Sequence, residues 1–129
     1  MRKTTAATAT LLLAAALPVL GAGTAYAGDD EKIRRGPCSG TADWKLKAKT
    51  DDGGLEVEAE VDSNRNRQAW RWVLRHDGRV VDRGRSVTRG PSGSFDVERR
   101  TANHAGADAF RFRAVRANGG QVCVGRLRY

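Results

Sequence analysis

The chain has 129 residues and a formal net charge of +8, from 23 basic and 15 acidic side chains. This length supports a single small domain, and a composition of 40% hydrophobic and 29% charged residues is typical of a globular protein rather than a disordered or membrane-embedded one. Two cysteines are too few for a zinc ribbon or an iron–sulfur cluster. The sequence contains no motif of a catalytic site, so we expect a protein that is not an enzyme and needs no cofactor.

The start of the chain has the three parts of a secretory signal peptide. Residues 1–3 include an arginine and a lysine, residues 4–20 are mainly apolar, and residues 25–27 read Ala-Tyr-Ala, which fits a cleavage site. We expect cleavage after Ala27 and a secreted, extracellular mature chain with a net charge of +6, because two basic residues leave with the signal. A retained membrane anchor is the alternative, but a proline and two glycines dilute the apolar stretch, and no later segment could form a transmembrane span.

An alternation of apolar and charged side chains predicts a first β-hairpin. It runs through residues 43–50 and 54–62, and Asp52-Gly53 between them is a typical hairpin turn. With this turn at the tip, paired residue numbers sum to 105, so lysines face glutamates on one side and apolar residues face each other on the other. A single register that suits both faces is good evidence for that register. The expected charge pairs are Lys45–Glu60, Lys47–Glu58 and Lys49–Glu56.

Five more segments are predicted to be strands. They are residues 69–76, 79–88, 94–101, 108–117 and 121–128. Asp77-Gly78 and Asn118-Gly119 supply hairpin turns for the first two and the last two of them. The turn at Asn118-Gly119 gives paired numbers that sum to 237 and places Phe112 opposite Gly125, where its ring can cover the bare glycine backbone.

Seven short strands separated by turns predict an all-β fold, an antiparallel Ig-like β-sandwich. We expect residues 43–50, 54–62 and 94–101 in one sheet and the other four strands in the second. This pairing is unfavourable at one point, because Asp96 and Glu98 would lie near the glutamate row. The predicted core consists of Trp44, Leu46, Val57, Val61, Trp70, Trp72, Leu74, Phe95, Phe110, Phe112 and Leu127.

The domain boundaries follow from composition. Residues 28–40 are polar, charged and rich in glycine, so we expect a flexible N-terminal arm. Residues 41–129 contain no segment that reads as a linker, so we expect them to form a single β-sandwich domain. We expect the mature protein to be a monomer.

The cysteines and histidines lead to different expectations. Cys38 and Cys123 are the only cysteines of a chain that we expect to be exported, so we expect them to form a disulfide. The bond would close a loop over 85 positions and stabilise the fold by about 4–5 kcal/mol in the chain-entropy model. His76 and His104 have no second histidine or cysteine at metal-ligand spacing. We therefore expect ordinary turn or surface histidines, with neither a metal site nor a catalytic site.

Several short segments together resemble one group of proteins. They are Cys38-Ser39-Gly40, Trp44-Lys45-Leu46, Glu58-Ala59-Glu60-Val61-Asp62-Ser63-Asn64, Trp70-Arg71-Trp72, His76-Asp77-Gly78, Pro91-Ser92-Gly93-Ser94-Phe95 and Cys123-Val124-Gly125. In these segments, which extend over nearly the whole mature chain, the sequence is similar to uncharacterised small secreted proteins of actinobacteria of the Streptomyces type. No activity can be carried over from this group.

The arrangement of arginines suggests a binding surface. The strand period places six of them on one face of the second sheet with no acid among them, namely Arg71, Arg75, Arg111, Arg113, Arg126 and Arg128. Guanidinium groups bind phosphate and carboxylate groups in a forked geometry, so we expect an extracellular polyanion as the partner, such as a wall polymer or an anionic glycan. The face lacks interleaved aromatic residues, which argues against nucleic-acid bases. A solvated basic face without a partner is the alternative.

Two other classes of function fit a small secreted β-sandwich. A protein-binding module, such as a protease inhibitor, could present residues 63–68 as a rigid loop, although no cysteine lies beside it in the sequence to clamp it. A carrier of a small apolar ligand, of the neocarzinostatin type, would need a cleft and has two disulfides where this chain can form one. The sequence leaves both alternatives open.

Overall fold

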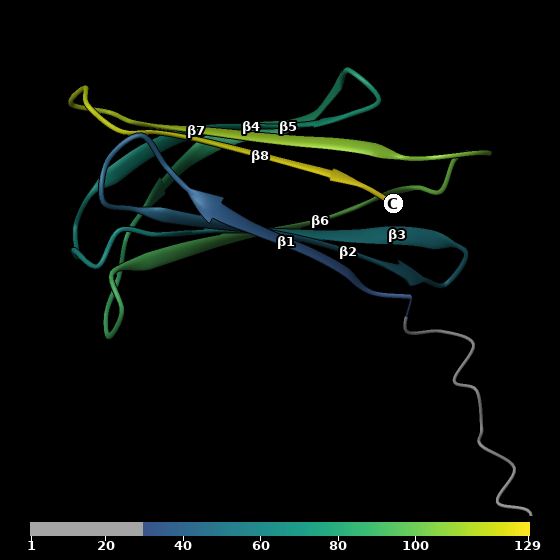
Figure 1. Cartoon of the computed structure of the whole chain (residues 1–129), viewed down its shortest axis with the longest axis horizontal. Coiled ribbons are helices and arrows are strands. Elements are labelled where there is room, and N and C mark those ends of the chain that lie inside the picture. Colours follow the sequence, from purple (N-terminus) through teal and green to yellow (C-terminus); the bar gives the residue numbers. More distant parts are fainter. Residues whose placement is uncertain (1–29) are drawn as a thin grey trace, which may run out of the picture.

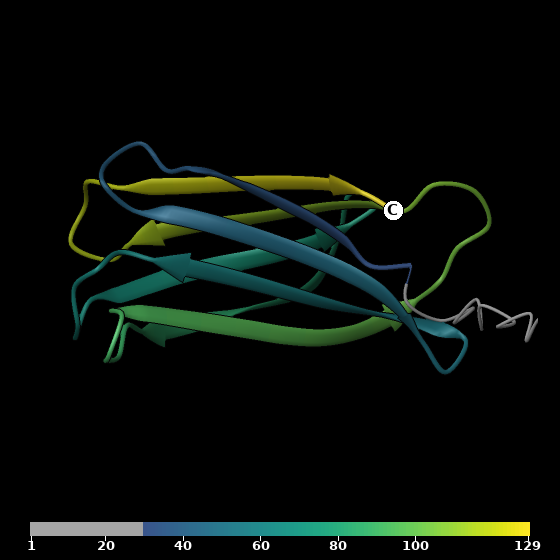
Figure 2. The same cartoon turned by 60° about the horizontal axis from the view of Figure 1, so that its bottom comes forward.

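The computed structural model describes residues 30–129, so the predicted signal peptide and its cleavage site lie outside the described residues. The eight strands of this part are β1 (Lys32–Pro37), β2 (Asp43–Asp51), β3 (Gly54–Asp62), β4 (Ala69–His76), β5 (Arg79–Val87), β6 (Ser94–Ala102), β7 (Ala109–Arg116) and β8 (Val122–Arg128). They form two antiparallel sheets, in the orders β1-β2-β3-β6 and β5-β4-β7-β8. Figures 1 and 2 show the sheets packed face to face, which confirms the predicted β-sandwich. Among residues 30–129, no helix is long and apolar enough to cross a membrane.

The registers predicted for two hairpins are confirmed. β2 pairs with β3 at residue numbers that sum to 105, as at Trp44 and Val61. β7 pairs with β8 at numbers that sum to 237, as at Phe110 and Leu127. The turn before β3 has positive φ at both central residues, 45° and 79°, and such a turn matches the twist of the strands that it joins. Turn chemistry and side-chain alternation therefore act together to set each register.

The first strand was not predicted. β1 lies within residues 28–40 and pairs with β2 at the edge of its sheet. An edge strand has one open side, and β1 is almost entirely exposed, so its sequence carries no apolar alternation. The structure thus gives these six residues a defined place in the sheet instead of a place in a flexible arm.

The core lies between the sheets and contains the residues predicted for it. All of them are buried except Trp44, which is partly buried and packs against the core. The indole of Trp44 lies between two glycine backbones, because a Cβ atom would be 2.7 Å from it at Gly36 and 2.7 Å from it at Gly125. The atoms nearest to that position of Gly125 all belong to Trp44, so Trp44, and not Phe112, covers this glycine.

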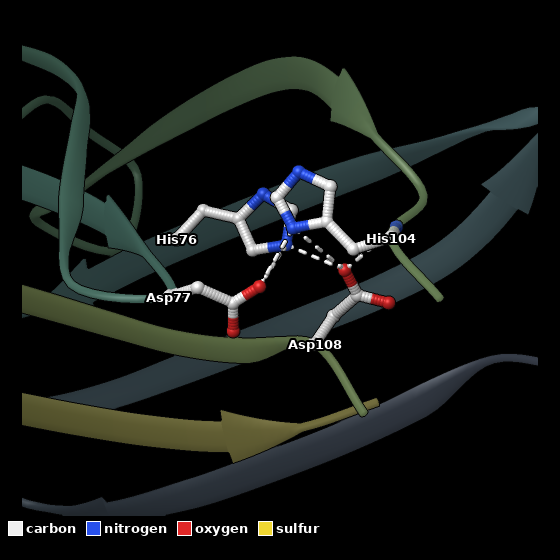
Figure 3. A group of neighbouring side chains, drawn as sticks. All are labelled: His76, Asp77, His104 and Asp108. Carbon is white, nitrogen blue, oxygen red and sulfur yellow. Dashed lines mark hydrogen bonds and ion pairs between the residues drawn. The ribbon is translucent and has the colours of Figure 1, made fainter. Parts of the chain in front are cut away.

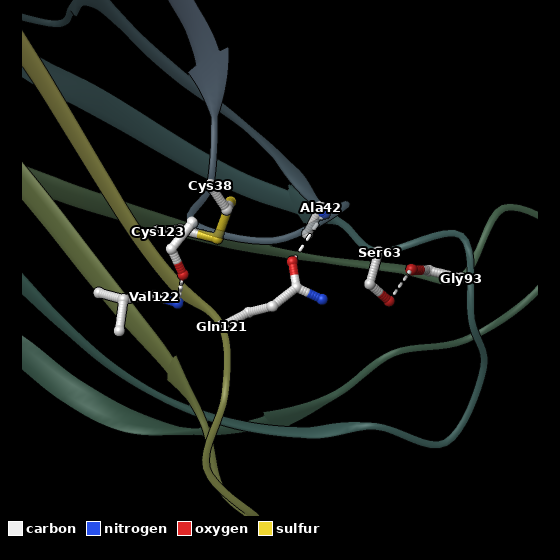
Figure 4. The surroundings of a disulfide bond; sticks show 8 residues. Cys38, Ala42, Ser63, Gly93, Gln121, Val122 and Cys123 are labelled. Carbon is white, nitrogen blue, oxygen red and sulfur yellow. Dashed lines mark hydrogen bonds between the residues drawn. A yellow bond between two sulfur atoms is a disulfide. The ribbon is translucent and has the colours of Figure 1, made fainter.

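A disulfide between Cys38 and Cys123 confirms the predicted pairing. Cys38 follows β1 and Cys123 belongs to β8, so the bond joins the edge strand of one sheet to the edge strand of the other (Figure 4). The backbone N–H of Ala42 donates to Oε1 of Gln121 at 2.7 Å and strengthens the same connection. Disulfides persist in oxidising compartments, so this bond fits an extracellular protein.

Candidate functional site

The six arginines predicted to form a binding surface lie together on the outer face of the β5-β4-β7-β8 sheet. In each strand they alternate with core residues, as Arg111 and Arg113 do with the buried Phe112. Directly paired residues share a face of the sheet. The pairs Arg75–Arg111 and Arg111–Arg126 therefore continue one row of guanidinium groups across three strands.

The structure adds two arginines that the sequence did not place on this face. The register between β4 and β5 shifts by one residue within their hairpin. The shift places Arg83 opposite Val73 and Arg85 opposite Arg71, on the outer face. Without it, both side chains would turn toward the core, because a shift of one residue exchanges the two faces of a strand. We call the complete set the arginine face: Arg71, Arg75, Arg83, Arg85, Arg111, Arg113, Arg126 and Arg128.

The arginine face has no internal counter-charge. Within residues 30–129, none of its guanidinium groups has a carboxylate within ion-pair distance. Arginine lies directly opposite arginine at Arg71–Arg85, Arg75–Arg111 and Arg111–Arg126. Side chains in such positions have Cβ atoms about 4.5–5.5 Å apart, so these pairs repel one another.

A shallow hollow of about 290 Å³ lies at one end of the arginine face. Its lining consists of Arg75, Gly78, Ala109, Phe110, Arg111, Arg126, Leu127 and Arg128. Four of these residues carry a guanidinium group, and most of the others are apolar. Most of the surface that lines the hollow is nevertheless apolar, so the hollow suits an apolar group of a ligand better than an anionic one.

On the outer face of the other sheet, the lysines are paired with glutamates. Lys45 lies 3.7 Å from Glu58 and 3.8 Å from Glu60. The unfavourable contact expected from β6 is also present, because Glu98 lies directly opposite Glu58. The lysines of this face are therefore already engaged by carboxylates, whereas the arginines of the arginine face are not.

Residues 63–68, the loop considered for a protease inhibitor, have a fixed shape. The hydroxyl of the buried Ser63 donates to the carbonyl of Gly93 at 3.1 Å, and the N–H of Gln68 donates to Oγ1 of Thr88 at 2.9 Å. These hydrogen bonds hold the loop to the segment that connects β5 to β6. Binding of a protease by this loop stays a prediction.

A second hollow, of about 550 Å³, lies beside β5 and the turn that precedes β6. Its lining is Arg85, Ser86, Val87, Arg89, Gly90, Pro91, Ser92, Ser94, Phe95 and Asp96. Two arginines, three serines and an aspartate make this hollow polar. The apolar hollow is the smaller one beside Phe110 and Leu127, so a carrier of the neocarzinostatin type would use that hollow and not this one.

A cluster of two histidines and two aspartates forms at one end of the sandwich (Figure 3). His76 ends β4 and Asp77 follows it in the turn to β5, whereas His104 and Asp108 belong to the loop between β6 and β7. Because β4 and β7 are antiparallel neighbours, the end of β4 meets the start of β7. The imidazole rings of His76 and His104 stack with their centroids 4.2 Å apart.

Two imidazole–carboxylate hydrogen bonds hold the cluster together. Nε2 of His76 lies 2.6 Å from Oδ1 of Asp108, and Nδ1 of His104 lies 2.7 Å from Oδ2 of Asp77. Two longer contacts close a ring of four atoms, at 3.5 Å between His76 and Asp77 and at 3.7 Å between His104 and Asp108. The hydrogen bond from His104, with a further one from the N–H of Ala109, holds the pKa of Asp77 below its usual value.

The sequence did not predict this cluster. His76 is 3% exposed and Asp108 is 1% exposed, so the prediction of an ordinary turn or surface residue is wrong for His76. His104, which is 48% exposed, fits that prediction better. The two histidines are 28 positions apart and meet only because β4 pairs with β7. The available signal was weak: each histidine has an aspartate within four positions in the sequence.

Comparison with models of protein families, with curated proteins and with solved structures finds no match for this chain. A function must therefore be inferred from its own residues. The arginine face and the histidine–aspartate cluster are the two features with chemistry that the fold itself does not require.

Proposed function

We propose that this protein is a secreted, non-enzymatic binding protein whose arginine face binds an extracellular polyanion, such as a wall polymer or an anionic glycan. One observation carries the proposal: eight arginines share one sheet face, and none has a carboxylate partner among the described residues. A planar guanidinium group forms two parallel hydrogen bonds with a phosphate or carboxylate group. A polymer of such groups would engage several arginines at once.

The spacing of the arginines favours a long partner over a small anion. The row Arg75–Arg111–Arg126 crosses three strands about 4.8 Å apart, so it presents positive charge over about 10 Å. Closely spaced like charges raise the potential at the surface and repel one another, and a bound anion relieves this repulsion. A small anion would neutralise two or three of these groups, whereas a polymer along the face would neutralise most of them.

The remaining residues of the face favour an anionic polymer over nucleic-acid bases. The outer positions between the arginines of β4, β7 and β8 hold small apolar residues: Val73, Ala109, Val115, Val122 and Val124. None of them is aromatic, so the face has no platform on which bases could stack. The predicted secretion would bring the protein to wall polymers and anionic glycans.

Retention on immobilised heparin and on immobilised polyphosphate tests the proposal and separates a sulfated glycan from a phosphate polymer. The purified protein should bind at low salt and elute as NaCl rises, because the screening length falls to about 3 Å at 1 M. The test variant combines Arg111→Gln, Arg113→Gln and Arg126→Gln. The matched control combines Lys45→Gln, Lys47→Gln and Lys49→Gln.

We expect the arginine variant to elute at much lower salt than the lysine variant, although both lose three positive charges. The reason is that the lysines already contact glutamates, whereas the arginines are available to a ligand. Equal losses in both variants would show that net charge, and not the arginine face, causes retention. No retention of the unaltered protein on either polymer would leave a solvated basic surface.

A further inference from the structure

We infer that His76, Asp77, His104 and Asp108 form a binding site for a divalent transition-metal ion, with Zn²⁺ as the ion that the site fits best. Each residue offers one ligand atom, and these four atoms all lie within 4.8 Å of one another. One point therefore lies within about 2.9 Å of all four, so the atoms need to move inward by less than about one ångström to reach Zn–N and Zn–O bond lengths of about 2.0–2.2 Å.

Tetrahedral binding requires the ring of His104 to turn, because the two imidazole planes are only 7° apart and a metal ion lies in the plane of each ring that binds it. The ligand atoms around a tetrahedral zinc lie about 3.3–3.6 Å apart, by the geometry of its bond lengths. The contacts at 3.5 Å and 3.7 Å already have about this spacing. The two hydrogen-bonded contacts, at 2.6 Å and 2.7 Å, would open by about one ångström or less. His104 can supply much of this movement because it lies in a loop and its side chain is half exposed.

Outer hydrogen bonds orient the ligand atoms. Nδ1 of His76 lies 2.9 Å from Oγ1 of Thr101, and Oδ1 of Asp77 accepts from the N–H of Ala109 at 2.8 Å. A threonine hydroxyl can donate or accept, so His76 can carry its proton on Nδ1 and present the lone pair of Nε2 to a metal ion. Such second contacts fix the tautomer and the direction of metal ligands. Thr101 is thus a positioning residue of the site.

The same residues include a possible catalytic arrangement. Thr101, His76 and Asp108 follow one another in the hydroxyl–imidazole–carboxylate order of nucleophilic enzymes. A triad, however, does not require His104 and Asp77, which converge on the same point. Metal binding accounts for all four residues of the cluster.

The charge and the access of the cluster suit a cation. Two carboxylates with two neutral imidazoles carry a charge that matches a divalent ion, and mixed nitrogen and oxygen ligands favour zinc over calcium or magnesium. A hollow of about 210 Å³ opens beside the cluster and provides a path from the solvent. It is lined by His76, Arg79, Val80, Val81, Thr101 and His104.

A bound ion would give the sandwich a second cross-link. The disulfide lies at the start of β8, at Cys123, whereas the backbone N–H of Asp108 donates to the carbonyl of Tyr129 just after the end of β8. The two cross-links would therefore be roughly 20 Å apart, the length of this strand. The ion would join the β4–β5 turn to the loop between β6 and β7.

Thermal unfolding with added ZnCl₂ tests the site. The purified protein must have no histidine tag, an intact disulfide and prior treatment with a chelator. We expect Tm to rise with the logarithm of free zinc, by about 10 °C at a 100-fold excess over the dissociation constant. Co²⁺ in place of Zn²⁺ should produce the visible absorption bands of a tetrahedral cobalt site.

Three variants test the assignment of the residues. His104→Ala removes an exposed loop side chain, so it should leave the metal-free fold intact while weakening zinc binding by more than about 100-fold. Thr101→Val should weaken it by about 10-fold, as the loss of an orienting contact does. Glu98→Gln, which removes a carboxylate from the opposite sheet, should respond to zinc as the unaltered protein does. The proposal would be overturned if zinc did not raise the Tm of the unaltered protein. It would also be overturned if zinc raised the Tm of His104→Ala as much as that of the unaltered protein.

Discussion

The two outer faces of the sandwich differ in how their charged side chains are paired. On β2 and β3, Lys47 lies 3.5 Å from Glu58, and neighbouring lysines and glutamates repeat the arrangement. On β4 and β7, Arg75 lies directly opposite Arg111. Both faces arise from the same strand period, so the period does not explain the difference. Charges on the first face stabilise the register of their own sheet, whereas charges on the arginine face contribute nothing of this kind and are available to a partner.

The largest expected effect concerns the bond that keeps both faces on one body. Replacing Cys38 and Cys123 by serine should lower the free energy of unfolding by about 4–5 kcal/mol, because a loop over 85 positions is no longer closed in the unfolded chain. Domains of this size have about 5–15 kcal/mol in total, so Tm should fall by about 15 °C or more in thermal unfolding. A fall of less than about 5 °C would show that packing alone holds the sheets together.

The second prediction compares the faces directly through stability. Neutralising the lysines should lower Tm by several degrees, because the glutamates lose their partners while Glu58 and Glu60 still face acids of β6. Neutralising the arginines should leave Tm unchanged or raise it, because each directly opposed pair of like charges is unfavourable by about 0.2–1 kcal/mol. The variants are Lys45→Gln/Lys47→Gln/Lys49→Gln and Arg111→Gln/Arg113→Gln/Arg126→Gln. Calorimetry at one salt concentration measures both, and equal falls in Tm would contradict the comparison.

The third prediction concerns the repulsive contact between β3 and β6 on the outer face of their sheet. Glu98 lies directly opposite Glu58, so Glu98→Lys should convert a repulsive pair into an attractive one and raise Tm by about 2–4 °C. Glu98→Gln only removes the repulsion and should give roughly half of the gain. If neither variant raises Tm, the contact between these side chains has no part in the stability of the sheet.

The smallest effect concerns an ion pair that joins the two sheets. Oδ2 of Asp82 lies 2.7 Å from Nε of Arg99, and this hydrogen bond holds the pKa of Asp82 below its usual value of 3.8. A carboxyl group with a lowered pKa in the folded state stabilises the fold above its unfolded pKa and loses this contribution as pH falls through the lowered pKa.

Asp82→Asn should therefore lower Tm slightly at pH 7, and in acid, at a pH below the lowered pKa of Asp82, the difference from the unaltered protein should vanish. Thermal unfolding at both pH values measures it. Arg99 also lies over the ring of Trp72, with 5.4 Å between its guanidinium carbon and the ring centroid. A difference that persists in acid would assign the effect to this packing and not to the charge of Asp82.

The sequence by itself determined the features that depend on neighbours in the chain. The turn at Asp52-Gly53 and the alternation on both sides of it set one hairpin register, and Asn118-Gly119 set another. The same period placed six arginines on one face. The disulfide followed from the presence of only two cysteines in a chain that reads as exported.

The tertiary structure alone decided which distant side chains meet. A register shift of one residue, invisible in the alternation, turned Arg83 and Arg85 outward. Strand pairing and a loop between the sheets brought His76 and His104 together. Trp44 packs against two glycines, one on β1 and one on β8, and these strands belong to different sheets. The physical reason is the same in each case: a local period records whether a side chain points inward or outward, and only the packing of strands and sheets determines what it contacts.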